Sequence, residues 1–174
     1  MQVTRDGTHW TDITANLKDS PHCYVSRIEA SHVDAATAYL SMDCHRSDDL
    51  RPHVYVTRDY GRTWASISGD LPAFGNVNVI RQDTKNPNLL FAGTEFGVYA
   101  SLDEGKSWKK FMTGLSTVRV DELIVHPRDG DLIVGTHGRS VLIMDDITAL
   151  QQLGAASGAN SGAVLSQDAY LFQP

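Results

Sequence analysis

The sequence predicts an all-β chain of four-stranded antiparallel sheets, arranged as the blades of a β-propeller, and three observations support this prediction. One motif recurs as "VTRDYGRTW" (56–64) and "ASLDEGKSW" (100–108), and in shorter form as "VTRDGTHW" (3–10). Asp59 and Asp103 are 44 residues apart, a period typical of propeller blades. Apolar alternation, β-branched residues and Gly/Asn/Asp turns favour short strands, and no segment has a convincing helical period.

The repeat divides the chain into half a blade, two full blades and most of a third full blade, at residues 1–14, 24–68, 77–112 and 120–145. The second full blade shows its strands most clearly, at 77–82, 89–93, 97–101 and 108–111. Such a unit cannot cover its own faces, so it stacks on its neighbours. Because propeller rings have at least about four blades, about 3.5 blades do not close a ring alone. We therefore expect a longer propeller or a homodimer that completes the ring.

The composition changes after residue 147. Residues 1–147 carry the blades, whereas residues 148–174 include the Gly/Ala/Ser-rich stretch "QQLGAASGANSGAVLSQ", which is typical of a flexible linker. The closing "DAYLFQP" is apolar enough to dock on another part of a protein. We expect a linker followed by a docking tail.

The overall composition excludes some classes of partner. The chain has 41% hydrophobic and 21% charged residues and a net charge of −6. Without a Lys/Arg run, such a chain is not expected to bind nucleic acid or an anionic membrane. No apolar stretch approaches the roughly 18 residues of a membrane span, and the N-terminus has no signal-peptide pattern. A strand-and-turn pattern follows Met1 at once, so we expect the chain to start inside something larger.

Two cysteines flank a pair of strand-like runs. Cys23 precedes Val25–Ala30, and Cys44 follows Ala38–Met42. If these runs form a hairpin, the cysteines face each other at its open end, since opposed residues lie ~4.5–5.5 Å apart. A disulfide is then possible. Two half-buried free thiols are the alternative, favoured by the lack of a visible export signal.

The recurring motif resembles the Asp-box, S/T-x-D-x-G-x-T/S-W, of sialidase-type and sortilin-type propellers. The first copy lacks one residue, and the last, "IMDDI", keeps Asp145 without the Gly and Trp. The Asp carboxylate can accept backbone N–H bonds of its own turn, Gly permits an unusual backbone angle, and Trp buries a large ring between blades. We therefore expect a folding role, without chemistry, for the motif residues Asp6, Asp59, Gly61, Trp64, Asp103, Gly105 and Trp108.

Nearly the whole chain resembles the C-terminal propeller blades of large bacterial proteins of the sortilin-like or BNR-repeat glycosyl hydrolase type. The resemblance lies in "NLLFAGTEFGVYASLDEGKSW", "VHPRDGDLIVGTHGRSVLIMDDITAL" and "DAYLFQP". It implies a ligand site on the face opposite the Asp-boxes and a secreted or periplasmic location. The hydrolase label of that family is itself mostly inferred from Asp-boxes, so it implies little about activity.

Three turns between strands are expected on that opposite face: "DCHRSDDLRP" (43–52), "TEFG" (94–97) and "THGR" (136–139). The first is longer than its counterparts and rich in charge, which on a rigid scaffold usually has a reason. A solvated loop held by its own Asp–Arg pairs is the alternative. The candidate ligand-binding residues are Asp43, His45, Arg46, Asp48, Asp49, Glu95, His137 and Arg139.

Two enzyme classes can be weighed against these residues. A sialidase would need three arginines on inner strands. Arg27 and Arg81 lie on first strands but at non-equivalent positions, and no third arginine fits. A glycosidase would use two carboxylates at a set separation, which Asp48, Asp49 and Glu95 could supply.

A metal or nucleotide site has little support. Asp43, Cys44, His45 and His137 could ligate a divalent ion, but no close-spaced His/Cys motif of the strong kind is present. The segments "GTEFG" and "GTHG" join two strands, unlike a phosphate loop, which joins a strand to a helix. We expect no cofactor and no metal.

The sequence therefore predicts a non-catalytic binding or scaffold module that presents one loop face to a protein, a peptide or a glycan. A glycosidase-type hydrolase that uses carboxylates on the same face is the alternative. A structural segment without any ligand is a third possibility.

Overall fold

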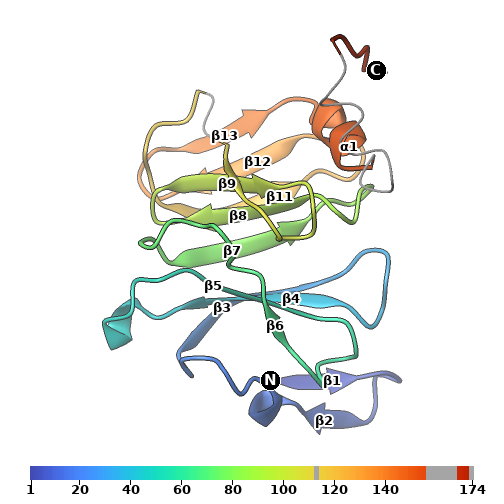
Figure 1. The fold of residues 1–174 in the computed structure, drawn as a ribbon, viewed down its shortest axis with the longest axis vertical. Coiled ribbons are helices and arrows are strands. Elements are labelled where there is room, and N and C mark those ends of the chain that lie inside the picture. The colour runs from blue at the N-terminus through green and yellow to red at the C-terminus, as the bar shows by residue number, and fades with distance from the viewer. Residues whose placement is uncertain (112–113, 156–167, 173–174) are drawn as a thin grey trace.

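The computed structural model of the chain describes residues 1–111, 114–155 and 168–172. It is nearly all-β, and its sheets stack along the long axis of the molecule from the N-terminal hairpin to the third sheet (Figure 1). Neighbouring strands pair in antiparallel fashion throughout. The predicted architecture of about 3.5 blades of antiparallel strands is confirmed.

The strands form four sheets, each made of strands consecutive in the chain. The N-terminal hairpin consists of β1 (Gln2–Thr4) and β2 (Trp10–Asp12). The first sheet consists of β3 (Tyr24–Ala30), β4 (Ala38–Asp43), β5 (His53–Thr57) and β6 (Ala65–Ser66). The second sheet consists of β7 (Val77–Gln82), β8 (Leu90–Thr94), β9 (Gly97–Ser101) and β10 (Lys109–Lys110). The third sheet consists of β11 (Val120–Val125), β12 (Leu132–Thr136) and β13 (Val141–Met144).

Helices are few. Two 3₁₀ turns, η1 (Thr14–Asn16) and η2 (His45–Ser47), lie in loops. The α-helix α1 (Thr148–Ala155) follows β13 and lies beside the third sheet (Figure 1). Its first turns begin where the sequence suggested a linker. The reason is tertiary packing, because Ile147 and Gln151 are buried and Leu150 packs against the core. Residues 156–167, the rest of the expected linker, lie outside the described residues.

The hydrophobic core is divided among the boundaries between sheets. One cluster joins the first and second sheets, with Tyr39, Val54 and Leu90 among its members. A second joins the second and third sheets through residues such as Phe91 and Leu123. A third lies between the first sheet and the segment that follows the N-terminal hairpin. Each sheet therefore gains stability by covering the face of its neighbour, as stacked repeats do.

In each repeated turn, one aspartate carboxylate accepts hydrogen bonds from another residue of the same turn. Asp59 accepts hydrogen bonds from the Thr63 backbone N–H at 2.9 Å and the Thr63 hydroxyl at 2.7 Å. Asp103 accepts the same pair from Ser107, at 2.9 and 2.6 Å. These bonds, led by the Thr63 N–H, hold the pKa of the Asp59 carboxyl at about 2, well below its ordinary value.

Two left-handed residues shape each of these turns. Tyr60 and Gly61 have φ of 60° and 78°, and Glu104 and Gly105 have φ of 61° and 85°. A glycine is needed at the second position for a further reason, since a Cβ on Gly105 would meet the Ile67 side chain at 2.9 Å. In the shorter N-terminal copy, the His9 N–H takes over the hydrogen bond to Asp6, at 2.8 Å.

The three tryptophans that follow these turns differ in burial. Trp108 is 3% exposed between the first and second sheets, and its indole N–H donates to the Ile67 carbonyl oxygen at 2.9 Å. Trp64 is only half-buried, and its indole N–H has no partner in the described part of the chain. Trp10 is 58% exposed. Burial of the tryptophans therefore increases along the stack. Trp10 lies in the terminal hairpin, Trp64 directly before the last strand of the first sheet, next to that hairpin, and Trp108 directly before the last strand of the second sheet, next to the four-stranded first sheet.

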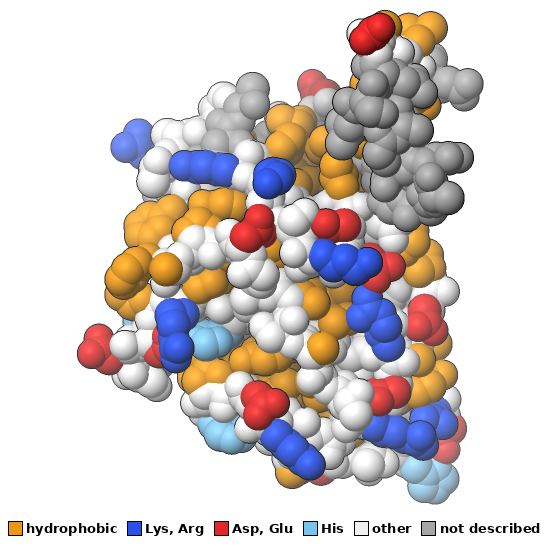
Figure 2. Space-filling model, in the orientation of Figure 1, with side chains coloured by type: hydrophobic (Ala, Val, Ile, Leu, Met, Phe, Trp, Pro, Cys, Tyr) orange, Lys and Arg blue, Asp and Glu red, His pale blue; other side chains and the backbone are white. Residues whose placement is uncertain are grey.

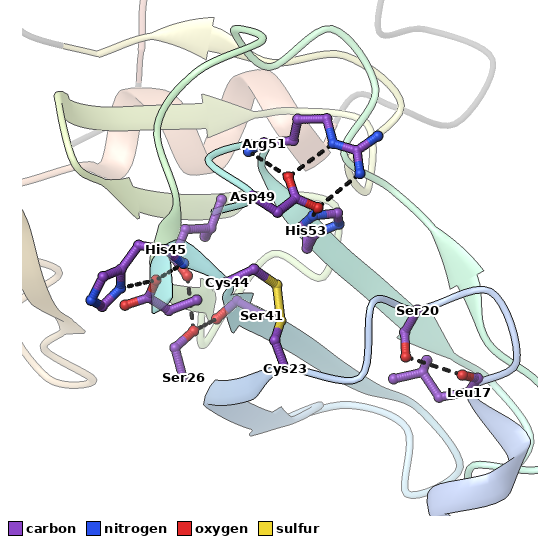
Figure 3. Close-up of a disulfide and its surroundings, with 12 residues drawn as sticks. Leu17, Ser20, Cys23, Ser26, Ser41, Cys44, His45, Asp49, Arg51 and His53 are labelled. Atoms are coloured by element: carbon purple, nitrogen blue, oxygen red, sulfur yellow. Dashed lines mark hydrogen bonds and ion pairs between the residues drawn. A yellow bond between two sulfur atoms is a disulfide. The ribbon is translucent and has the colours of Figure 1, made fainter. Parts of the chain in front are cut away.

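Cys23 and Cys44 form a disulfide at the open end of the β3–β4 hairpin, where Tyr24 pairs with Asp43. Their Cα atoms are 5.3 Å apart, which fits directly opposed residues. The bond ties the segment before the first sheet to the start of its long loop (Figure 3).

Candidate functional site

The long loop that follows β4 begins with a buried carboxylate. Asp43 Oδ1 accepts a hydrogen bond from the His45 backbone N–H at 3.1 Å and lies 2.6 Å from His45 Nδ1. Next to it, Cys44 is buried in the disulfide. The side chains of Arg46 and Asp48 are exposed and make no hydrogen bond or ion pair to other described residues.

Asp49 lies beside Arg51 and His53 at the far end of the loop (Figure 3). Its carboxylate accepts two hydrogen bonds from Arg51, at 2.9 and 2.8 Å, and lies 3.0 Å from His53 Nε2. The bidentate Arg51 contact, helped by His53, lowers the pKa of the Asp49 carboxyl well below its ordinary value. Asp49 thus belongs to a loop-internal Asp–Arg pair.

A second group of charges forms on the loop face of the second and third sheets. Arg119 Nε donates to Asp121 at 2.6 Å, and Arg119 Nη1 donates to Glu95 at 3.4 Å. His137 Nδ1 lies 3.2 Å from the other oxygen of Asp121, and the His137 N–H donates to the Arg119 carbonyl oxygen at 2.9 Å. We call these four residues the Arg119 cluster.

The Arg119 cluster is electrostatically joined to the first sheet. The hydrogen bond to Asp121 raises the pKa of Arg119, and the charges of Glu95, Asp121 and Asp43 add to this effect. Partial burial raises the pKa of Asp121, but the hydrogen bonds from Arg119 and His137 lower it overall. The charge of Asp43, from the first sheet, therefore acts on Arg119 together with its direct partners.

Asp121 occupies a position that repeats in all three sheets. Each inner strand carries a bulge, at Ser26, Asn78 and Asp121. The Ser26 hydroxyl donates to the Val77 carbonyl oxygen at 2.8 Å, and the Asn78 amide donates to the Val120 carbonyl oxygen at 3.1 Å. An ionised carboxylate has no proton to donate. Asp121 therefore accepts a hydrogen bond from Arg119, at the bulge position where Ser26 and Asn78 donate to the next sheet.

The predicted site residues thus separate into three groups. Glu95 and His137 come together through Arg119 and Asp121, which the sequence did not single out. Asp43 and His45 form their own pair near that cluster. The remaining predicted residues stay apart from it: Arg46, Asp48 and Arg139 are exposed without a partner among described residues, and Asp49 pairs with Arg51 and His53.

A separate ion network connects the inner strands. Arg81 donates to Glu29 at 2.5 Å and to Glu122 at 2.8 Å, and its Nε donates to the Leu123 carbonyl oxygen at 2.7 Å. Arg27 donates to Glu122 as well. Burial lowers the pKa of Arg81, but the Glu29 and Glu122 contacts raise it overall.

Strand pairing gives the registers of the two inner-strand arginines. Ile28 pairs with Leu40 and Ile80 with Ala92, so Arg27 precedes one isoleucine and Arg81 follows the other. The two arginines are therefore not equivalent, as predicted, and both are already bound to glutamates of this chain. Such arginines hold the sheets together and are poorly placed to bind a ligand carboxylate.

Two further features bear on the class of site. Among the described residues, no three His, Cys, Asp or Glu side chains are grouped as a metal ion would require. No helix of the described chain is both long enough and apolar enough to cross a bilayer. The view in Figure 2 shows acidic and basic side chains interspersed, with hydrophobic side chains exposed between them.

The stacked antiparallel sheets, each of strands consecutive in the chain, define a repeat protein of the propeller class. The family model Sortilin-Vps10, described as "Sortilin, neurotensin receptor 3", matches residues 52–168. Because the match covers more than half of the chain, the protein belongs to this family. Among curated proteins, none matches the chain.

Solved structures of propeller enzymes have a similar fold. An ancestral GH74 enzyme is 19% identical, with a TM-score of 0.56 over 67% of this chain and 14% of its own. The GH74 enzyme of Niastella koreensis is 16% identical, with a TM-score of 0.58 over 70% of this chain and 21% of its own. At these identities the similarity shows the fold alone. The chain spans less than a quarter of the length of either enzyme.

Proposed function

We propose that the protein is a non-catalytic propeller module that binds a protein, peptide or glycan through the face carrying the Arg119 cluster and the long loop after β4. The observation behind this proposal is that side chains from the second and third sheets meet on that face in one hydrogen-bonded cluster. Membership of the sortilin family agrees with a binding role. In the same proposal, the turns of Asp6, Asp59 and Asp103 are structural Asp-boxes on the opposite face.

The ionisation of the carboxylates also supports binding. A glycosidase needs one carboxylic acid with a raised pKa to protonate the leaving group. Asp49 and Asp121 have lowered pKa values because arginines hold them ionised. Neither Asp48 nor Asp49 shares an ion-pair or hydrogen-bond partner with Glu95 in the described structure.

A glycosidase-type hydrolase is the alternative proposal, and the GH74 enzymes with the same fold are the reason to keep it. On this face, Glu95 and Asp121 are the carboxylates that share a common cation, Arg119. They would be the acid and base candidates if turnover were found.

The test compares binding and turnover in the same variants. Wild-type chain, Arg119→Ala and Glu95→Gln are screened against a displayed random peptide library, an immobilised glycan panel and a panel of chromogenic aryl glycosides. Arg128→Ala is the matched control, since Arg128 is an exposed arginine paired with Asp129 outside the cluster. Asp48→Ala and Asp49→Ala test the long loop.

The binding proposal expects at least about a tenfold loss of affinity in Arg119→Ala, as for the loss of a central charge pair, with Arg128→Ala unchanged. It also expects no glycoside turnover by any variant. Turnover by the wild type that Glu95→Gln abolishes would establish the hydrolase instead. Binding that survives Arg119→Ala, Asp48→Ala and Asp49→Ala would contradict this face as the ligand site.

A further inference from the structure

An apolar hollow opens at the boundary between the second and third sheets. Its volume is about 230 Å³, and side chains of both sheets line it. The lining includes Val98, Phe111, Leu115, Leu132, Val134 and Leu142. An apolar cavity of about 150 Å³ is enough to hold a benzene molecule, so this hollow has room for an aromatic side chain.

The same set of positions surrounds Trp108 one boundary earlier. The counterparts, in the same order, are Val54, Ile67, Leu71, Leu90, Ala92 and Tyr99, and all belong to the cluster that contains Trp108. Backbone pairing supports the correspondence, since the Ile67 N–H donates to Val54 at 2.9 Å and the Phe111 N–H donates to Val98 at 2.8 Å. Likewise, Tyr99 pairs with Ala92 and Leu142 with Val134.

The hollow therefore lies where a tryptophan would be if the third sheet had a fourth strand. In the second sheet, Trp108 directly precedes β10, which pairs with β9. The third sheet ends at β13, whose outer edge has no strand partner among the described residues. An unpaired edge beside an apolar hollow can accept an added strand that carries an aromatic residue.

We propose that the C-terminal segment 168–172 of this chain is that strand, with Tyr170 and Phe172 entering the hollow. Leu171 is 91% exposed and Tyr170 43% exposed, so the segment has unburied apolar side chains. The rings of Tyr170 and Phe172 lie 5.0 Å apart. Alternate residues of a strand share one face, and this places both rings on one side.

Chain order and length agree with this docking. The segment follows β13 in the chain, with α1 between them. A return along β13 would give the antiparallel pairing that β10 makes with β9. Residues 156–167 separate it from α1, and twelve residues span at most roughly 40 Å when extended. A strand of the same chain also has a high effective concentration at the edge. The inference does not depend on the proposed function of the loop face.

Amide hydrogen exchange of the full chain tests the docking. In the second sheet, the Val98 carbonyl oxygen accepts a hydrogen bond from the N–H of Phe111, which directly follows β10. Val141 of β13 is the counterpart of Val98, because Val98 pairs with Gly93 of β8 and Val141 pairs with Gly135 of β12. We expect the outward amides of β13, at Val141 and Ile143, to exchange at least about tenfold faster in the double variant Tyr170→Ala/Phe172→Ala. Asp168→Ala is the matched control and leaves exchange unchanged. Val134→Phe, which fills the hollow from within, accelerates exchange as the double variant does.

Several outcomes overturn the proposal. Equal exchange in the wild type and the double variant means that the segment does not cover β13. Protection that rises with protein concentration and survives the double variant assigns the edge to a second copy. Protection that appears only after adding the Trp-bearing peptide "DEGKSWKKF" assigns the hollow to a foreign strand.

Discussion

The two boundaries between the large sheets are built from matching positions, but only one contains a tryptophan. Between the first and second sheets, Trp108 is 3% exposed and its indole N–H is bonded. Between the second and third sheets, the matching positions line a hollow of about 230 Å³. The comparison indicates that neighbouring sheets align even without a tryptophan at their boundary, and that the aromatic residue after the repeated turn fills the space left between them.

Removal of Trp108 should have the largest effect on this comparison. Trp108→Ala is expected to cost about 3–5 kcal/mol, as for other buried aromatic truncations. Trp64→Ala should cost less, because Trp64 is half-buried, and Trp10→Ala should stay within about 0.5 kcal/mol, as exposed substitutions do. Urea denaturation followed by circular dichroism measures all three. Equal losses in the free energy of unfolding for Trp10→Ala and Trp108→Ala would show that burial does not determine the contribution of these tryptophans, and would contradict the comparison.

The disulfide distinguishes the first sheet from the other two. Loss of the Cys23–Cys44 bond, which spans 21 residues, should cost about 3 kcal/mol in the chain-entropy account. The double variant Cys23→Ser/Cys44→Ser is compared with the wild type in urea, with and without reductant. The wild type should approach the variant only when reductant is present. A wild type that is insensitive to reductant would mean that the thiols are free.

Two matched glycines report on whether the next sheet lies close. A Cβ on Gly93 would meet Val79 and Val120 at 2.5 and 2.7 Å, whereas the nearest atom to one on Gly135 is at 3.4 Å. Gly93→Ala should therefore cost about 1–3 kcal/mol through overpacking. Gly135→Ala, at the same place in the third sheet, should cost less than about 1 kcal/mol. Thermal unfolding compares the pair, and a reversed order would contradict the assigned packing of β8 against β11.

Acid should weaken the turns by a smaller amount. The pKa of the Asp59 carboxyl is about 2 in the folded chain, against an ordinary 3.8. A lowered pKa means that the turn contributes stability above pH 3.8, and that this contribution disappears as the pH falls towards 2. The melting temperature should decline over this window, and less steeply in Asp59→Asn. Identical profiles for the variant and the wild type would remove Asp59 from the acid response.

The fold could be predicted from the sequence because its signals are local and repeated. The Asp59 and Asp103 turns have the same residue types at the same spacing, and the hydrogen bonds they form lie within four residues. The helix α1 was missed because its stability depends on contacts distant in the chain: Ile147 is buried in the core between the second and third sheets, and Gln151 donates to Asp83 at 2.8 Å. A Gly/Ala-rich composition near it gave a stronger signal for a linker.

The candidate site was less accessible to sequence reasoning. Glu95 and His137 were singled out, but Arg119 and Asp121 were not, because the partners lie 24 and 16 residues apart in the chain. The usable signal was the bulge position, where Ser26 and Asn78 donate and Asp121 cannot. Recognising that position requires knowledge of the strand register, because a shift of one residue would move every side chain to the other face of the sheet.

The most direct test of the central claim asks whether the hollow accepts an indole ring. Indole is titrated into the full-length Tyr170→Ala/Phe172→Ala variant, and methyl NMR follows Leu132, Val134 and Leu142. We expect saturable shifts of these methyl groups that Val134→Phe abolishes, with the methyl groups around Trp108 unshifted. No shift at the hollow, or equal shifts at Val54 and Leu90, would contradict the claim that the two boundaries are built alike and differ only in their aromatic residue.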